Sequence, residues 1–385
     1  MTIRPEQFRG RLPATAFAFR GYNVTNLGRT PELLEHAAYG PIVETALREG
    51  SKLAADVLGR PIDLVERVRR RRETHDLGTY AEDVTLIVSA SLAQLRVLDQ
   101  CFGVPFSGAK LTFGHSLGEA SALIATGMYR MEDLLRVLLS LTDDSVALAE
   151  DVTMGILFSR GPILDLGAVQ RLCVEINQQG RGTMGVSSHL SPNCVLLLGA
   201  GDTLDQFRQH MPERLPPLVS LRKHGGRWPP LHTPITWQRY LPNRAAVLLQ
   251  TAPGGLTAPT PPLLSGVTGK ASFNDYNSRE LLRRWVDETQ QLWEQMVQTI
   301  NAGVQTIVHV GPAPNLIPAT FKRLADDIRG AQKGYSPSSL GLRAIAQVMR
   351  RPWLAQLLPA YAGLLRVPFI EHLVLEDWLL EQQVA

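Results

Sequence analysis

The chain has 385 residues, which is too long for one small domain and long enough to bury a substantial hydrophobic core. Its hydrophobic content of 44% and charged content of 19% are typical of a globular protein in water. A formal net charge of +3 gives no support for nucleic-acid binding, and no apolar run approaches the length of a membrane span. The N-terminus lacks the apolar core of a signal peptide, so we expect a cytoplasmic protein that binds neither nucleic acid nor membrane.

The three cysteines, Cys101, Cys173 and Cys194, are odd in number and lack the spacing of metal ligands. They therefore predict neither a disulfide framework nor a metal site.

The first 126 residues predict strands and helices in α/β order. Apolar residues indicate a strand at 16–19, which runs into a loop at 20–23. Helical spacing follows at 83–98, then a short strand at 110–113 and a helix at 119–126. This succession is typical of an α/β fold.

From about residue 154 the pattern changes to short strands that alternate with helices. The expected strands are 155–158, 185–187, 195–198 and 218–221, with helices at 166–177 and 203–210. A β-α-β-β-α-β order is the signature of a ferredoxin-like unit.

The remaining chain returns to the α/β pattern. We expect a strand at 264–267, a long helical region at 278–302, a buried strand at 306–310 and a helix at 315–324. The predicted organisation is an α/β-hydrolase-like core formed by residues 1–150 and 215–330, a ferredoxin-like subdomain inserted at 151–214, and a helical C-terminal extension at 331–385.

The segment Gly114-His115-Ser116-Leu117-Gly118 lies between the strand at 110–113 and the following helix. Its glycines permit a sharp turn, and the helix N-terminus favours negative charge beside Ser116. This is the pattern of a nucleophile elbow, which suits acyl transfer through a serine ester. Lipases and thioesterases share it, and a tight strand-to-helix turn without catalysis remains an alternative.

Three landmarks occur in order: Gly114 to Glu119, then Leu231-His232-Thr233-Pro234-Ile235, then Val310-Gly311-Pro312. Together they resemble the malonyl-CoA:acyl carrier protein transacylase family, which includes the acyltransferase domains of polyketide synthases. The resemblance covers about residues 14 to 325. It implies a two-step reaction through an acyl-serine, in fatty acid or polyketide synthesis.

Several roles follow from this resemblance. Ser116 matches the family's nucleophile and His232 its general base, which a backbone carbonyl orients. That carbonyl comes from the segment 285–288, and Glu288 is the expected residue. The backbone N–H groups of Leu117 and Tyr22 are expected to form the oxyanion hole, whereas His115 is expected to be structural.

The acyl pocket departs from the family pattern. Malonyl-specific members carry an arginine 25 residues beyond the nucleophile, where this chain has Leu141, followed by Asp143 and Asp144. A malonyl carboxylate would lose its ion-pair partner and meet like charge. We therefore expect a pocket lined by Leu141 and Leu231 that takes an acyl group lacking a free carboxylate.

The function that the resemblance implies is transfer of an acyl group from acyl-CoA to an acyl carrier protein. The acceptor is the carrier's phosphopantetheine thiol, and no cofactor of the enzyme is expected. Hydrolysis of acyl-carrier thioesters and a non-catalytic carrier-binding module are the alternatives. In an ordinary α/β hydrolase, His309 or His372 would serve as the base.

Two basic clusters stand out from the rest of the chain. Arg67 and Arg69 to Arg72 are expected to form a solvated helix end. Arg222, Lys223 and Arg227 precede His232 in sequence, so they are better placed to attract an acidic carrier protein.

Overall fold

A computed structural model describes residues 3–73, 76–160, 163–333 and 363–383. The chain forms two β-sheets, one of five strands and one of four, with helices packed around them. The expected α/β fold class is confirmed. No helix within the described ranges is long and apolar enough to span a membrane.

The large sheet has the strand order β7-β2-β1-β8-β9 and is parallel throughout. Its strands are β1 (Thr15–Phe19), β2 (Leu111–Gly114), β7 (Leu263–Leu264), β8 (Thr306–Val310) and β9 (Glu371–Val374). Parallel sheets are covered by helices on both faces, which explains why β1, β2 and β8 are buried along their whole length.

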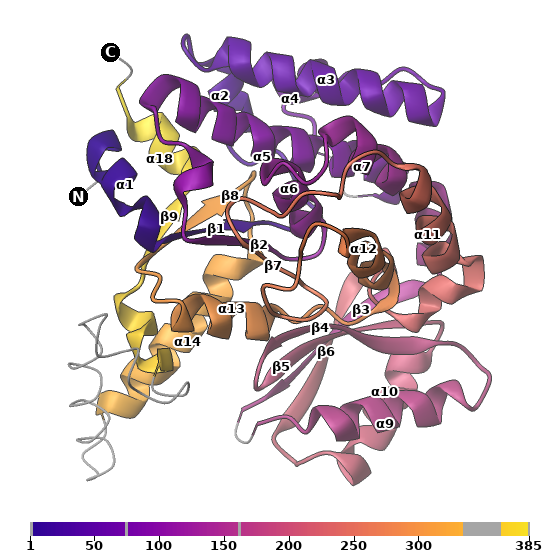
Figure 1. Ribbon diagram of the computed structural model, residues 1–385. Helices are drawn as coiled ribbons and strands as arrows, with labels where there is room; N and C mark the ends of the chain where they lie inside the picture. The colour runs from indigo at the N-terminus through magenta and orange to yellow at the C-terminus, as the bar shows by residue number, and fades with distance from the viewer. Residues whose placement is uncertain (1–2, 74–75, 161–162, 334–362, 384–385) are drawn as a thin grey trace.

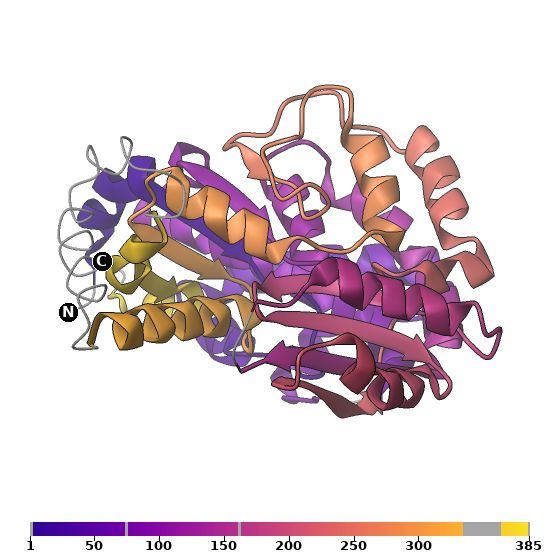
Figure 2. The ribbon, with the colours of Figure 1, turned by 90° about the horizontal axis from the view of Figure 1, so that it is seen from below.

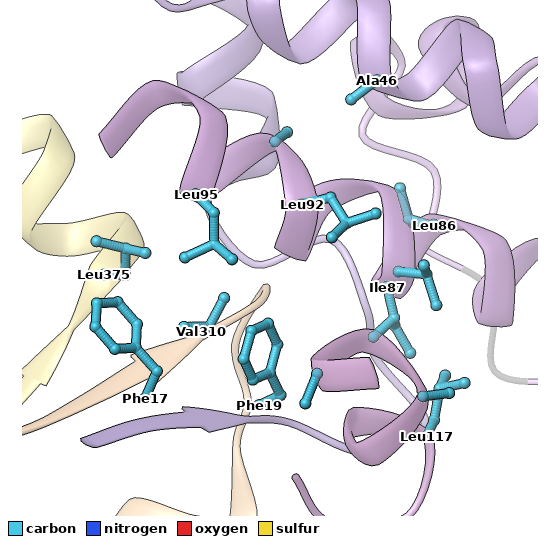
Figure 3. Close-up of a cluster of buried hydrophobic side chains, with 14 of the residues drawn as sticks. Phe17, Phe19, Ala46, Leu86, Ile87, Leu92, Leu95, Leu117, Val310 and Leu375 are labelled. Atoms are coloured by element: carbon cyan, nitrogen blue, oxygen red, sulfur yellow. The ribbon is translucent and has the colours of Figure 1, made fainter. Parts of the chain in front are cut away.

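Alternate side chains of β1 supply two separate cores. Phe17 and Phe19 face the core beneath α5, together with Val310 of β8, as Figure 3 shows. Ala16 and Ala18 point to the opposite face, where α13 and α14 pack. Small residues on that face allow these helices to approach the sheet closely.

The helices around the large sheet are α1 (Pro5–Arg11), α2 (Thr30–Glu35), α3 (Gly40–Leu58), α4 (Leu64–Arg69), α5 (Tyr80–Phe102), α6 (Leu117–Ala125), α7 (Met131–Leu139), α8 (Thr142–Ala149), α11 (Leu241–Thr251), α12 (Ser278–Asp287), α13 (Leu292–Asn301), α14 (Leu316–Lys333) and α18 (Leu375–Glu381). Short 3-10 helices are η1 (Leu12–Ala14), η2 (Leu77–Thr79), η3 (Phe106–Gly108), η4 (Pro234–Arg239) and η5 (Leu364–Phe369). Figure 1 shows α5 and α6 on one face of the large sheet and α13 and α14 on the other.

The second sheet belongs to the inserted subdomain. Its strands are β3 (Val152–Ser159), β4 (Met184–Ser191), β5 (Cys194–Ala200) and β6 (Val219–Arg227), in the antiparallel order β4-β5-β3-β6. Helices α9 (Leu166–Asn177) and α10 (Thr203–Arg214) cover one face. This is a ferredoxin-like arrangement, and β6 carries it to residue 227, beyond the expected boundary at 214.

The region expected as one long helix from 278 to 302 is two helices, and that prediction is wrong. α12 ends at Asp287, α13 begins at Leu292, and the turn between them bonds to the small sheet. Gln290 donates its N–H to the carbonyl of Ser187 and accepts from the N–H of His189. The backbone therefore leaves the helix to join the two subdomains.

The C-terminal extension is not only helical. Residues 371–374 form strand β9 at the edge of the large sheet, and α18 then packs beside α1 (Figures 1 and 2). Trp378 meets Phe8 edge to face at 5.2 Å. The part of the expected helical extension at 334–362 lies outside the described residues.

Arg67 is not solvated as expected, because it is 7% exposed and pairs with buried Asp83 of α5. Arg69, Arg70 and Arg71 of this run form exposed ion pairs with glutamates, among them Arg69 with Glu44.

Candidate active site

Ser116 lies on a strained turn between β2 and α6. Its backbone has φ 54° and ψ −122°, a conformation that L-residues rarely adopt. A Cβ on Gly114 would lie 2.1 Å from the carbonyl carbon of Gly118, and one on Gly118 would lie 2.2 Å from the oxygen of Phe19. Both glycines are therefore required by close backbone contacts, as a nucleophile elbow demands.

Ser116 and His232 form a hydrogen-bonded pair although 116 residues separate them. The serine Oγ lies 2.7 Å from His232 Nε2, and His232 Nδ1 lies 2.6 Å from the carbonyl oxygen of Trp285. Because a carbonyl only accepts, Nδ1 carries the proton, and Nε2 is free to accept from the serine hydroxyl. The indole N–H of Trp285 also donates to the carbonyl of Ser116, at 3.2 Å.

His232 is held neutral and in one orientation. It is 4% exposed, and burial lowers its pKa to about 3, while the Trp285 carbonyl opposes that shift. Its own backbone N–H donates to the carbonyl of Val286 at 2.7 Å. The imidazole is therefore unprotonated at neutral pH and able to take the serine proton.

The expectation that Glu288 supplies the orienting carbonyl is wrong, because Trp285 does so. The Glu288 side chain instead pairs with Arg284, at 2.7 Å to Nε and 2.8 Å to Nη2. The last carbonyls of a helix lack intrahelical partners. α12 ends at Asp287, so Trp285 and Val286 carry such carbonyls, and knowledge of this helix end would have identified them.

The two expected oxyanion donors flank Ser116. Leu117 is the first residue of α6, so its N–H has no acceptor within the helix. Tyr22 lies in the loop after β1, where a Cβ on Gly21 would stand 2.6 Å from the carbonyl oxygen of His115 and 3.4 Å from Ser116 Cβ. The loop thus runs directly over the nucleophile, and Gly21 permits that approach.

A small chamber opens beside Ser116. We call it the acyl chamber; its volume is about 30 Å³, and it is lined by Tyr22, Tyr80, Val84, Ser116, Leu117, Leu138, Leu141, Thr142, Ser145, Leu231 and Trp285. Leu141 and Leu231 line it as expected. No lysine or arginine of the described residues does so.

Neither Arg20 nor the nearby aspartates reach the acyl chamber. The Arg20 guanidinium is buried and donates to Asn26 Oδ1 and to carbonyl oxygens of Gly21 and Pro312. Asp144 pairs with Arg239 and Arg244. The like-charge repulsion expected from Asp143 and Asp144 is therefore not supported, since neither lines the chamber.

A larger groove lies on the other side of Tyr22, between the two subdomains. Its volume is about 420 Å³, and its apolar walls include Ile156, Leu190, Leu196 and Leu316. Tyr22 contributes to both the groove and the acyl chamber, and its ring meets Trp228 edge to face at 5.5 Å. This large groove reaches Tyr22 and His115, which neighbour the nucleophile, and its size suits a long ligand.

The other histidines do not contact Ser116. His115 Nε2 lies 3.0 Å from Ser188 Oγ, which supports a structural role. His309 and His372 lie on β8 and β9 with their ring nitrogens 2.9 Å apart, and they line neither the acyl chamber nor the large groove. Among the described residues, no group of three His, Cys, Asp or Glu side chains could hold a metal ion.

Glu119 is a buried acid beneath the nucleophile. It lies on α6, is 1% exposed, and accepts the N–H of Gly266 at 2.9 Å through Oε1. Its Oε2 and the Oε1 of Gln290 both lie beside Gly266, and neither has a partner among the described residues. Burial raises the pKa of Glu119 to about 8, so this carboxyl is neutral at pH 7.

The native protein should lose folding stability at alkaline pH because of Glu119, and Glu119→Gln should prevent this loss. A pKa raised from 4.5 to about 8 means that the folded state binds this proton more tightly than the unfolded state. The resulting stability is complete below pH 4.5 and is lost as pH rises through 8. Between pH 7 and 9 the native chain should lose about 1.4 kcal/mol that the variant retains.

Urea unfolding at both pH values measures this difference. Glu213→Gln is the control, because Glu213 is exposed on α10 and should leave the loss intact. Equal alkaline losses in both variants would show that Glu119 is ionised in the fold.

The parallel sheet, the nucleophile elbow and the hydrogen-bonded Ser116–His232 pair form an arrangement that serine acyltransferases share with serine hydrolases. The chain is 26% identical over 319 residues to the malonyl CoA-acyl carrier protein transacylase of Salmonella typhimurium, which covers 81% of this chain and 93% of that protein. The chain is thus a relative of the malonyl-CoA:acyl carrier protein transacylases, and the expected resemblance is confirmed. No family model matches it.

Solved structures show the same fold. FabD from Acinetobacter baumannii aligns with a TM-score of 0.64 and 21% identity, over 81% of this chain and 91% of that one. A malonyl-transacylase solved in complex with its type II polyketide synthase acyl carrier protein aligns with a TM-score of 0.61 and 20% identity, over 80% and 91%.

Proposed function

We propose that this chain is an acyl carrier protein S-acyltransferase that uses Ser116 as its nucleophile and His232 as its general base. The observation that carries the proposal is the 2.7 Å contact between Ser116 Oγ and His232 Nε2, in an imidazole oriented by a backbone carbonyl. The likeness to transacylases supports the same assignment.

In the first half-reaction, Ser116 attacks the thioester carbonyl of acyl-CoA while its proton passes to His232 Nε2. The N–H groups of Leu117 and Tyr22 stabilise the oxyanion. Collapse of the tetrahedral intermediate breaks the carbon–sulfur bond, and His232 returns its proton to the departing thiolate. The products are free CoA and an ester on Ser116.

In the second half-reaction, the phosphopantetheine thiol of a carrier protein gives its proton to His232 and attacks this ester. Ser116 Oγ then leaves and recovers the proton from His232 Nε2. The large groove supports the proposal, because a long arm can reach the nucleophile through it. The exposed Arg222 and Arg227 on β6 are suited to attract an acidic carrier.

The transferred group is a short acyl chain without a free carboxylate. The acyl chamber supports this, because its volume of about 30 Å³ has room for roughly two water molecules, which suits only a short chain. Its apolar residues offer no cation to a carboxylate, and Leu141 is only 4% exposed. Burying an unpaired carboxylate there would cost on the order of 3 kcal/mol.

Leu141→Arg should shift donor preference toward malonyl-CoA by more than about tenfold, equivalent to roughly 1.4 kcal/mol. The added guanidinium supplies the bidentate partner that a carboxylate needs. Equal amounts of acetyl-CoA and malonyl-CoA compete for Ser116, and intact mass reads the adducts. We expect acetyl to predominate in the native chain.

Leu141→Met is the matched control, since it conserves side-chain volume without adding charge and should leave the ratio unchanged. A native preference for malonyl would overturn the assignment of an uncharged acyl group. It would leave the acyltransferase proposal intact.

A further inference from the structure

Glu376 is a buried carboxylate with no role in the proposed reaction. It lies at the start of α18, beyond strand β9, and is 1% exposed. Leu375 beside it packs near Phe17 and Val310 in the core (Figure 3). The last helix begins where β9 ends, beside β8 at the edge of the large sheet.

The two oxygens of Glu376 hold two separate segments. Oε2 accepts the N–H of Arg29 at 2.9 Å, and Oε1 accepts the N–H of Ala313 at 2.9 Å. Between them lies Gly28, with φ +50°, where a Cβ would stand 2.7 Å from Oε2 and 2.4 Å from the Ala313 nitrogen. The carboxylate therefore joins the loop after β1 to the turn after β8.

Arg20 extends this connection to Tyr22. Its buried guanidinium donates to the carbonyl of Pro312, the neighbour of Ala313, and to Asn26 Oδ1 at 2.9 Å. Its Nε donates to the carbonyl of Gly21 at 2.7 Å. Glu376 and Arg20 thus fix the same turn from two sides, and the Gly21–Tyr22 peptide is bonded to that assembly.

We propose that Glu376 is a positioning residue, whose carboxylate fixes the loop of residues 20–29 and thereby the N–H of Tyr22 over Ser116. This inference rests on the proposed function, in which that N–H stabilises the oxyanion. A backbone N–H stabilises the oxyanion only when it lies within hydrogen-bond distance of that oxygen. Only an ionised carboxylate can accept fully through both oxygens, so a neutral group here holds one segment less well.

The surroundings of Glu376 shift the pKa of its carboxyl group to near neutral pH. Burial raises its pKa to about 7, against the lowering effect of the Arg29 and Ala313 N–H groups. Of the charged neighbours, Asp377 raises the pKa and Arg20 lowers it. Below pH 7 one of the two bonds that Glu376 accepts, from Arg29 or from Ala313, should therefore weaken.

Glu376→Gln tests the proposal, because the amide keeps the shape but has a single acceptor oxygen. Acylation of Ser116 by 4-nitrophenyl acetate should fall roughly tenfold in kcat at pH 8, with KM changed less than about twofold. Asp377→Asn is the matched control: Asp377 forms an exposed 3.1 Å pair with the Arg29 side chain, so kcat should be unchanged. Equal rates for Glu376→Gln and the native chain would overturn the proposal.

The pH profile separates positioning from general stability. Native acylation should rise between pH 6 and 8, whereas the Gln variant should stay at its low value throughout. His232, with a pKa of about 3, adds nothing in this range. A rise that persists in the variant would belong to Glu119 or Asp83, whose pKa values are also raised, and would overturn the proposal.

Hydrogen exchange provides a readout that does not depend on catalysis. The amides of Arg29 and Ala313 should exchange faster in Glu376→Gln, and unchanged exchange would contradict the inference. If this variant does not fold, a flat native profile from pH 6 to 8 would overturn it instead. If native Ser116 is never acylated, the proposed function fails while the exchange measurement still tests the Glu376 contact.

Discussion

Ser116→Ala should abolish the acyl-enzyme. The native chain, incubated with acetyl-CoA, should gain one acetyl group by intact mass, and the variant should gain none. Because Ser116 Oγ is the only proposed site of the ester, transfer should fall by at least about 10³-fold. The backbone strain at residue 116 is independent of its hydroxyl, so the variant should fold normally.

Ser121→Ala is the matched control, since Ser121 is buried within α6 and its replacement should not affect acylation. Addition of a carrier protein bearing phosphopantetheine should discharge the native adduct onto its thiol. Loss of the adduct to water at the same rate without carrier would favour the hydrolase alternative. Absence of an adduct with a broad panel of donors would favour a non-catalytic binding module.

His232→Ala should reduce both half-reactions by about 10³-fold or more. A serine hydroxyl is a poor nucleophile without a proton acceptor, and the same imidazole must protonate the leaving thiolate. Single-turnover acylation by acetyl-CoA and deacylation by carrier measure the two steps separately. His224→Ala, at an exposed position on β6, should leave both rates unchanged.

A His232→Ala variant with nearly full activity would remove this residue from the mechanism. His309 and His372 would then return as candidates, although their rings bond to each other at the far strands of the sheet. No second histidine approaches Ser116 Oγ closely enough to replace His232 among the described contacts.

Sequence periodicity predicted the strands and most of the helices, because an element with a buried face needs apolar residues at regular intervals along its whole length. The helix at 166–177 and the strand at 306–310 were predicted at their observed bounds. The break after Asp287 was missed, since residues 288–291 contain neither glycine nor proline and leave the helix only to bond with β4. Tertiary contacts override local propensity there.

Side-chain chemistry was easier to predict from sequence than backbone chemistry. Ser116 and His232 stand in recognisable motifs, and the structure brings them into contact. Trp285 acts through its carbonyl, which every residue possesses, so only the end of α12 identifies it. Glu376 was missed because its partners lie far away in the sequence, and no local pattern connects them.

The turn between α12 and α13 makes the inserted subdomain part of the catalytic framework. The carbonyl that orients His232 lies five residues before Gln290, whose backbone bonds to β4. Replacing the small subdomain with that of a relative would therefore affect the orientation of His232 as well as the lining of the large groove. A graft that altered the β4 edge would rotate the base away from its serine, so hybrid enzymes should be joined with Ser187 and His189 kept in place.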